Sequence, residues 1–269
     1  MIIFPAVTTL EGVPLDKPRI GYQTWTRSAA PGDIAASSEA VGFPKDAPLR
    51  PDTYEYWMPT ALPAQWVLEF GATRDIDYAG IAAHNMGTLG CTVRAETQVG
   101  ADPYDQIAVD ATPADNGAVM FIDESRPADR VRITIEGSGD APFVGVIYVG
   151  TVLAMTKSVS GPFKPITMAR DTVLQNALSR GGQFLGQDYR RNGTMGSISF
   201  KHLAAAWVRA NFEQFSKEAR RYPYFIAWNP LEYPDECDYC WTDDDITAQY
   251  EGLMDLMEVS WKMRGLGAE

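Results

Sequence analysis

The sequence predicts a mainly β protein with two β-sandwich modules, the C-terminal one flanked by a single long α-helix. Short apolar segments separated by Gly, Pro, Asp and Asn recur at roughly 10–15-residue intervals, which is typical of strands in a sandwich. Only one segment, 202–220, has strong helical periodicity. One polar, breaker-rich stretch, 156–165, interrupts the strand pattern. Together these observations indicate β modules on either side of 156–165.

A chain of 269 residues is long enough for one large β domain or for two domains of about 100–150 residues each. Because the stretch 156–165 holds few large apolar groups, we place a boundary there. We therefore predict a galactose-binding-like sandwich at 1–155 and a second sandwich at 156–269. We expect the N-terminal arm, 1–30, to be available for pairing with the second module.

The first module begins with a segment, 1–60, in which Pro and Gly are too frequent for long helices. Only the Ala/Ser-rich stretch Ile34–Val41 is expected to form a short helical turn. From Trp66 onward the strand signal is stronger, and Trp66, Leu68 and Phe70 fall on one face.

Further strands of the first module are predicted at 78–83, 92–97, 107–110, 131–136 and 144–153. The clearest alternation places Val131, Ile133 and Ile135 inward. The segment 144–153 is largely apolar on both faces, which is typical of a buried central strand.

In the second module, 171–178 is expected to pair with the Gly-rich stretch that ends at Phe200. Asn192-Gly193 is predicted to form a tight hairpin turn, since Asn-Gly is the strongest short hairpin signal. Three more strands are predicted at 224–228, 239–241 and 254–263. In the last of these, Met257, Val259 and Trp261 share one face.

The predicted helix, 202–220, has a broad apolar surface. Two adjacent rows form it, one of Leu203, Ala206, Trp207 and Ala210 and the other of Val208, Phe212 and Phe215. We expect the helix to pack on a sheet, with a neighbouring subunit over the rest. The basic last turn complements the helix dipole before Pro223.

The charge is distributed unevenly along the chain. Residues 1–155 carry a net charge of -10, 156–221 carry +7, and 222–269 carry -9, which gives -12 for the whole chain. A basic middle followed by an acidic end is typical of the complementary faces of a head-to-tail interface. Pairing of the two segments within one subunit explains the pattern equally well.

Composition excludes several classes of function. A net charge of -12 is unfavourable for nucleic-acid binding, which depends on clustered Lys and Arg. No run of 18 or more apolar residues indicates a membrane span, and MIIFPAVTTLEG lacks the features of a secretory signal. Three cysteines are too few for a disulfide framework, which fits synthesis in a reducing cytoplasm.

The region 54–153 contains, in order, YWMP, QWVLEFG, IDYAGIAAHNMG, a strand beginning at Cys91, VRITIEG and VGVIYVG. This order resembles the discoidin or galactose-binding-like sandwich. The resemblance implies sugar binding, and in some members a calcium ion, and points to a glycan or ion loop of Asp75, Asp77, His84 and Asn85. The alternative is that these are turn residues, where Asp and Asn are favoured.

The region 160–269 has a strand pair, one long helix and then more strands, with YPYFIAWNPLEYPDE after the helix and MEVSWKMRG near the end. This plan resembles the distal tail proteins of bacteriophages. The resemblance implies a homo-oligomeric ring in the virion, made in the host cytoplasm, that docks on tube and hub proteins and carries a sugar-binding-like domain toward host glycans. From the charge pattern we predict interface residues at Arg190, Arg191, Trp207, Arg220, Arg221, Asp243, Asp244 and Asp245.

Chemical motifs are weak. Cys237 and Cys240 have zinc or redox spacing, but a second such pair is absent from the sequence, so we predict no metal and no cofactor. No carboxylate pair, nucleophile elbow or nucleotide-binding glycine pattern indicates an enzyme.

We therefore predict a non-catalytic structural protein of a phage tail tip. The alternative is a carbohydrate-binding protein, or the binding module of a glycan-active enzyme.

Overall fold

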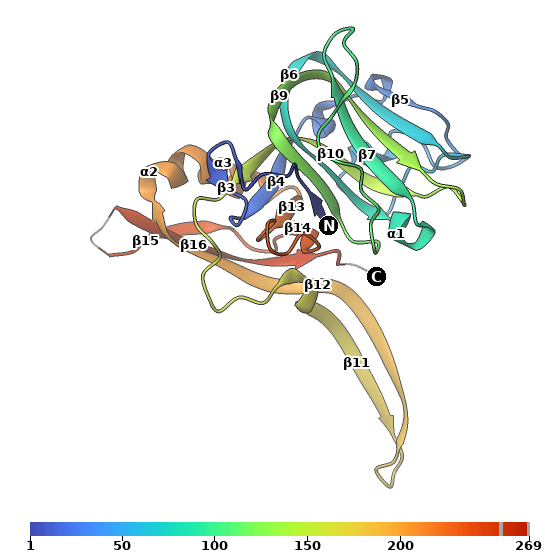
Figure 1. The fold of residues 1–269 in the computed structure, drawn as a ribbon. Coiled ribbons are helices and arrows are strands. Elements are labelled where there is room, and N and C mark those ends of the chain that lie inside the picture. The colour runs from blue at the N-terminus through green and yellow to red at the C-terminus, as the bar shows by residue number, and fades with distance from the viewer. Residues whose placement is uncertain (253–254, 268–269) are drawn as a thin grey trace.

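The computed structural model describes residues 1–252 and 255–267 and is mainly β, as predicted (Figure 1). Fourteen of its strands form one sheet with the central order β11-β12-β16-β14-β13-β4-β10-β6-β9-β7-β8. The strands are β1 (Ile2–Ile3), β2 (Thr9–Leu10), β3 (Val13–Pro14), β4 (Arg19–Thr24), β5 (Ile34–Ala36), β6 (Ala64–His84), β7 (Thr92–Gln98), β8 (Asp105–Gln106), β9 (Val119–Glu136), β10 (Val144–Ala154), β11 (Arg170–Leu178), β12 (Phe184–Ala204), β13 (Tyr224–Ala227), β14 (Cys237–Trp241), β15 (Thr247–Tyr250) and β16 (Leu256–Gly265). The α- and π-helical segments are α1 (Met86–Leu89), α2 (Ala205–Trp207), a π-helical turn (Val208–Phe212) and α3 (Glu213–Glu218), and three-residue 3₁₀ turns lie at Thr26–Ser28, Pro31–Asp33, Ala47–Leu49 and Ile166–Met168.

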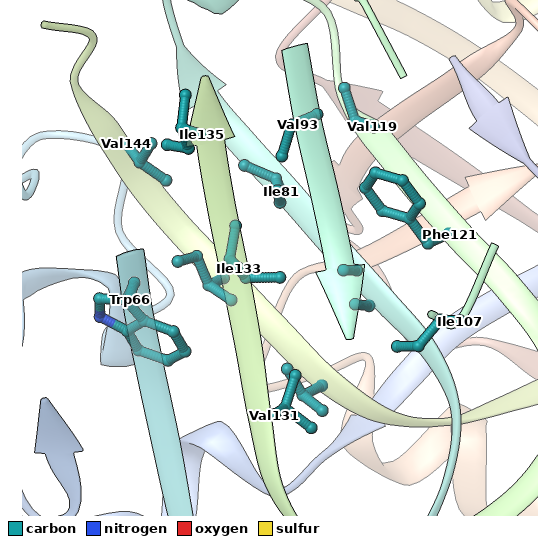
Figure 2. Close-up of a cluster of buried hydrophobic side chains, with 14 of the residues drawn as sticks. Trp66, Ile81, Val93, Ile107, Val119, Phe121, Val131, Ile133, Ile135 and Val144 are labelled. Atoms are coloured by element: carbon teal, nitrogen blue, oxygen red, sulfur yellow. The ribbon is translucent and has the colours of Figure 1, made fainter. Parts of the chain in front are cut away.

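The first module is organised by β6 and β9, which pair antiparallel along most of their length and curve around a hydrophobic core (Figure 1). Breaks in their register, between Glu69 and Arg74 and between Ile76 and Tyr78, accompany this curvature. Figure 2 shows the core, in which Trp66, Val131 and Ile133 are fully buried. The predicted inward face of 131–136 is therefore confirmed, and on the predicted common face of the β6 segment Trp66 and Leu68 are buried while Phe70 is half-buried.

Three local predictions in the first module were wrong. Ile34–Val41 forms no helical turn, because Ile34–Ala36 pairs with β6 as strand β5. The predicted strand 107–110 is absent, and the short strand β8 ends at Gln106. The predicted strands beginning at Trp66 and Tyr78 are one continuous strand, β6, since the bulges bend it without ending it.

Strands β4 and β10 connect the two halves of the sheet. β4 pairs with β10 on one side and with β13 on the other, so part of 1–30 lies between residues of both predicted modules. β10 lies between β4 and β6, and its residues Val144–Gly150 are buried. The prediction of a central buried strand at 144–153 is confirmed.

The second core lies under the helix and contains Tyr22, Phe200, Phe215, Tyr224 and Trp261. The ring of Phe215 contacts four other rings, with centroids 5.3 Å from Tyr22, 5.4 Å from Phe212, 5.0 Å from Tyr224 and 5.6 Å from Trp261. The predicted strands 224–228 and 239–241 are present as β13 and β14, and the predicted common face of Met257, Val259 and Trp261 on β16 is buried. Met254, which begins the predicted last strand, lies outside the described residues.

The helical segment is shorter than predicted. β12 continues to Ala204, with an irregularity between Phe200 and Leu203 and a positive φ of 58° at His202, so the helix begins at Ala205 and not at residue 202. Val208, Phe212 and Phe215 are buried as predicted, but Ala206 and Ala210 are exposed. Ala206 and Ala210 lie two positions before and after Val208, which in a helix places them on the side opposite the buried row.

The strands β11 and β12 form a long hairpin that projects from the body of the molecule (Figure 1). Its turn lies at 179–183, where the N–H of Ser179 donates to the carbonyl oxygen of Gln183 (2.8 Å). The hairpin turn predicted at Asn192-Gly193 is therefore wrong. Gly193 instead occupies an irregularity in β12 with φ of 99°, where a Cβ atom would lie 2.2 Å from the carbonyl oxygen of Gly265.

Candidate binding sites

A groove with a volume of about 560 Å³ lies on the surface of the first module. It is lined by Gly42, Phe43, Pro44, Arg50, Tyr54, Glu55 and Tyr56. Two tryptophans anchor the segments that form it. The indole N–H of Trp57 donates to the carbonyl oxygen of Ser38 (2.9 Å), and that of Trp66 donates to Lys45 (2.8 Å). Because both indole rings are fully buried, the sandwich core holds the groove in a preformed shape.

The groove combines aromatic faces with one charged pair. The rings of Phe43 and Tyr56 stack on each other, with centroids 4.9 Å apart and planes at 14°. The side chain of Tyr54 is 89% exposed, so a face of its ring is available to a ligand. Arg50 and Glu55 form an ion pair beside it and supply hydrogen-bond donors and acceptors. Such a surface suits a neutral ligand with both C–H faces and hydroxyl groups.

The residues predicted to form a glycan or ion loop are not brought together. Asp75 and Asp77 lie near the middle of β6, whereas His84 ends that strand and Asn85 follows it. His84 lies nine positions after Asp75, which corresponds to roughly 30 Å of extended strand. Asp77 is buried, accepts a hydrogen bond from the N–H of Val152 (2.7 Å), and has its pKa raised well above the ordinary value by burial. The oxygen of Asn85 accepts from the N–H of Phe143 (2.9 Å). The side chains of Asp77 and Asn85 are thus used as hydrogen-bond acceptors for backbone N–H groups of the same chain.

His84 makes the folded state sensitive to acid. Its ring is buried, Nδ1 accepts a hydrogen bond from the N–H of Met86 (3.3 Å), and burial lowers its pKa to about 4. As the pH falls, His84 therefore takes up a proton near pH 6.5 in the unfolded chain but only near pH 4 in the folded protein. We expect the free energy of unfolding to fall in this window by up to about 1.4 kcal/mol per pH unit.

Urea titrations at several pH values would measure this fall, and the His84→Gln variant should show a flatter profile. His202→Gln makes the same change at the other histidine, whose side chain is 70% exposed, and His84→Gln should flatten the profile more than His202→Gln does. An unchanged pH profile in His84→Gln would rule out His84 as the cause.

Cys237 and Cys240 lie on strand β14 and point to opposite sides of the sheet. Cys237 packs in the core shared with Tyr78 and Phe225, whereas Cys240 packs in the core under the helix. A spacing of three in a strand places side chains on opposite faces, so the two sulfurs do not converge on one ion. Burial raises the pKa of Cys237 to about 12 and that of Cys240 well above its ordinary value. In the described part of the chain, no group of three or more His, Cys, Asp or Glu residues is placed to hold a metal.

The predicted interface residues fall into three groups. Arg190 is exposed on the projecting hairpin, and Asp243 and Asp244 are exposed in the acidic segment. Arg220 and Asp245 lie 3.5 Å apart within the same chain, so this pair joins the basic and acidic segments inside one subunit. Three further residues lie elsewhere, with Arg191 half-buried at the base of the hairpin, Trp207 packed against the second core, and Arg221 exposed after the helix.

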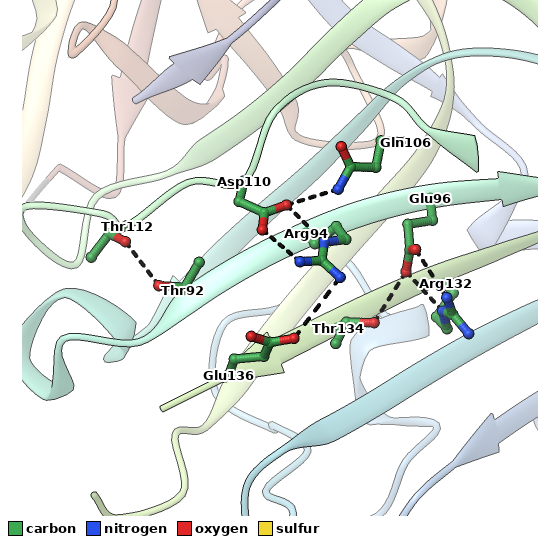
Figure 3. A network of polar contacts seen from close by, with 9 residues as sticks. All are labelled: Thr92, Arg94, Glu96, Gln106, Asp110, Thr112, Arg132, Thr134 and Glu136. Atoms are coloured by element: carbon green, nitrogen blue, oxygen red, sulfur yellow. Dashed lines mark hydrogen bonds and ion pairs between the residues drawn. The ribbon is translucent and has the colours of Figure 1, made fainter. Parts of the chain in front are cut away.

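The outer face of β7 and β9 carries a ladder of charges that are already paired (Figure 3). Arg94 makes two hydrogen bonds to Asp110 (2.7 and 2.6 Å), and Arg132 makes two to Glu96 (2.8 and 2.9 Å). The pairing with Arg94 lowers the pKa of Asp110. Because each of these arginines is held by a carboxylate, this face is a poor binding site for an anion.

No helix among the described residues is both long and apolar enough to span a membrane. No protein-family model and no curated protein matches the sequence.

Several solved structures resemble parts of the chain. A GH29 fucosidase from Ruminococcus gnavus, in complex with fucose, has 13% identity and a TM-score of 0.42 over 49% of this chain and 28% of that chain. A pectin-binding carbohydrate-binding module has 12% identity and a TM-score of 0.39 over 48% of this chain and 92% of the module. A CBM32 module from Clostridium perfringens, in complex with GalNAc-β-1,3-galactose, has 14% identity and a TM-score of 0.38 over 45% of this chain and 97% of the module.

This chain thus spans 28% of the length of the fucosidase. These neighbours are carbohydrate-binding modules and a glycosidase.

Proposed function

We propose that this protein is a non-catalytic carbohydrate-binding protein whose ligand site is the groove at 42–56. The observation that carries the proposal is the exposed ring of Tyr54 beside the Arg50–Glu55 pair in a groove of about 560 Å³. A sugar ring presents an apolar C–H face to an aromatic ring and hydroxyl groups to charged side chains. The groove offers both partners within one preformed surface.

A glycan array followed by calorimetry on the best ligand tests the proposal. We expect Tyr54→Ala to weaken binding about tenfold, equivalent to about 1.4 kcal/mol, because the stacking surface is lost. Tyr233→Ala removes an exposed tyrosine outside the groove and serves as the matched control, with affinity unchanged. Absence of any glycan ligand, or equal loss in both variants, would contradict the assignment of the groove.

A second candidate function is a ring-forming structural protein of a phage tail tip, which would place the protein in the virion with tube and hub proteins as neighbours. One observation favours it, namely the projecting β11–β12 hairpin, whose residues are almost all exposed (Figure 1). A long hairpin without intramolecular cover is typical of elements that complete a neighbouring subunit. Negative-stain images of the purified protein would separate the two candidates, since rings support the second and dispersed single particles contradict it.

A further inference from the structure

The groove at 42–56 is held from a distant part of the chain as well as from its own module. The hydroxyl of Tyr239, on strand β14, donates a hydrogen bond to the carbonyl oxygen of Pro51 (2.7 Å). The two residues lie 188 positions apart in the sequence, and β14 belongs to the second half of the sheet. Because proline has no backbone N–H, the carbonyl is the one hydrogen-bonding group that Pro51 offers.

Pro51 lies where its position affects the lining of the groove. It directly follows Arg50 and comes three residues before Tyr54, both of which line the groove. The turn that follows Pro51 is local, since Oδ1 of Asp52 accepts hydrogen bonds from the N–H groups of Tyr54 (3.3 Å) and Glu55 (3.2 Å). Such a turn fixes the shape of 52–55 but not its position on the body of the protein. The hydrogen bond to the Pro51 carbonyl ties the turn to that body.

The other ties on this segment come from the first module. Just after the groove residues, Trp57 exchanges two backbone hydrogen bonds with Val144 (2.9 and 2.8 Å). Before them, the indole of Trp66 holds the carbonyl oxygen of Lys45. The stretch from Arg50 to Glu55 lies between these two ties, so the bond to Pro51 acts where the first module holds the chain least directly.

The phenol ring of Tyr239 is itself firmly placed. The residue is 1% exposed, and its ring packs against Phe225 and Tyr148, with centroids 5.0 and 5.7 Å away. Its backbone N–H donates to Oδ1 of Asp238 (2.8 Å), and its carbonyl oxygen accepts from the N–H of Leu266 (3.0 Å). Burial raises the pKa of Tyr239 well above its ordinary value, so the phenol keeps the hydrogen that it donates.

We infer that Tyr239 is a positioning residue for the groove at 42–56, a role that rests on the proposed carbohydrate-binding function. Tyr239 does not line the groove. It holds the carbonyl of Pro51, so that Arg50 and Tyr54 present their side chains in the arrangement that a ligand meets. A ligand then need not order this segment on binding, which preserves affinity. The groove is therefore built by both halves of the chain, although all its lining residues lie in the first.

Tyr239→Phe tests this role, because it removes the hydroxyl and keeps the ring. Tyr78→Phe is the matched control. Tyr78 packs in the same core cluster, and its hydroxyl donates to the carbonyl oxygen of Gln23 (2.9 Å), outside the groove. Each variant thus loses one buried bond from a phenol to a backbone carbonyl, and we expect similar shifts of the urea midpoint. Amide hydrogen exchange, followed by NMR on the unliganded proteins, reports on the groove.

In Tyr239→Phe the amides of Arg50, Tyr54 and Glu55 should exchange about fivefold faster than in the wild type, the equilibrium effect usual for one hydrogen bond. In Tyr78→Phe they should keep the wild-type rates. A loss of global stability alone would instead speed exchange at the slowest amides, such as those of β13, and leave locally opening amides unchanged. Unchanged rates in Tyr239→Phe, or equal increases in both variants, would overturn the assignment of Tyr239.

Calorimetry measures the consequence for binding, with the neutral glycan that gives the strongest wild-type signal on the array as the probe. Tyr239→Phe should bind this glycan about two- to fivefold more weakly than Tyr78→Phe does, since part of the ordering then takes place on binding. Equal affinities of the two variants would also overturn the assignment.

The proposed function and the role of Tyr239 fail in different ways. If no glycan binds the wild type, the proposed function fails, and the exchange rates still decide whether Tyr239 positions the segment. If a glycan binds and Tyr54→Ala weakens it, while Tyr239→Phe changes neither exchange nor affinity, only the role of Tyr239 is refuted.

Discussion

Replacing Phe215 by alanine is expected to destabilise the protein by about 3–5 kcal/mol, the usual cost of removing a fully buried aromatic side chain. Phe215 lies at the centre of the second core, where its ring contacts Tyr22, Phe212, Tyr224 and Trp261. It links α3 to strands β4, β13 and β16, so the cavity left by the substitution cannot be filled by movement of one neighbour alone. Urea denaturation would measure the change in the free energy of unfolding.

Phe184→Ala is the matched control for this prediction, because it makes the same chemical change at an exposed position of the projecting β11–β12 hairpin. It should shift the free energy of unfolding by no more than about 0.5 kcal/mol at concentrations where the protein is monomeric. Similar losses in both variants would mean that Phe215 is not a central packing residue.

Replacing Asp238 by alanine should cost about 3 kcal/mol, through hydrogen bonds and not through packing. Asp238 is 1% exposed and accepts hydrogen bonds from the hydroxyl of Thr194 (2.8 Å), the N–H of Gly267 (3.0 Å) and the N–H of Tyr239 (2.8 Å). Burial raises its pKa, while these three donors act in the opposite direction. Alanine would leave three donors without their acceptor, next to the point where β12, β14 and β16 meet.

Asp238→Asn keeps one side-chain oxygen and should therefore lose less stability than Asp238→Ala. Asp235→Ala serves as the control, because Asp235 is exposed and lies nearby in the sequence. Chemical denaturation of the three variants in parallel would give the order of their free energies of unfolding. If the asparagine variant is as unstable as the alanine variant, the hydrogen-bond explanation fails.

Local alternation was enough to predict most of the strands. The inward residues of 131–136 and of 256–263 could be recognised because a half-buried strand must repeat its apolar residues every second position. The 3.6-residue period of a helix found the buried row of Val208, Phe212 and Phe215. Ala206 and Ala210 were wrongly placed beside this row, because residues two positions from Val208 lie on the opposite side of a helix and small residues give no strong signal of their own.

The candidate sites were much less predictable. Asp77 and Asn85 look like loop ligands in the sequence, yet each accepts a hydrogen bond from a backbone group distant in the chain. The groove at 42–56 was not predicted, because its residues lie in a segment without strand periodicity. The only part of the groove that belonged to a recognised sequence motif was Tyr56, which begins the YWMP segment.

Periodicity and composition were enough to predict that the protein is mainly β, that one helix packs on the second half, and that charge is divided between a basic and an acidic segment. The position of Asn192-Gly193, in contrast, depends on strand pairing across the fold. Asn-Gly favours a hairpin turn locally, but here the dipeptide lies within β12, between Arg191, which pairs with Thr172 of β11, and Thr194, which pairs with Gly265 of β16, and the turn lies at 179–183. The projecting β11–β12 hairpin exists for the same reason. Pairing between distant strands, rather than local propensity, determines where a sheet ends and which of its strands stay exposed.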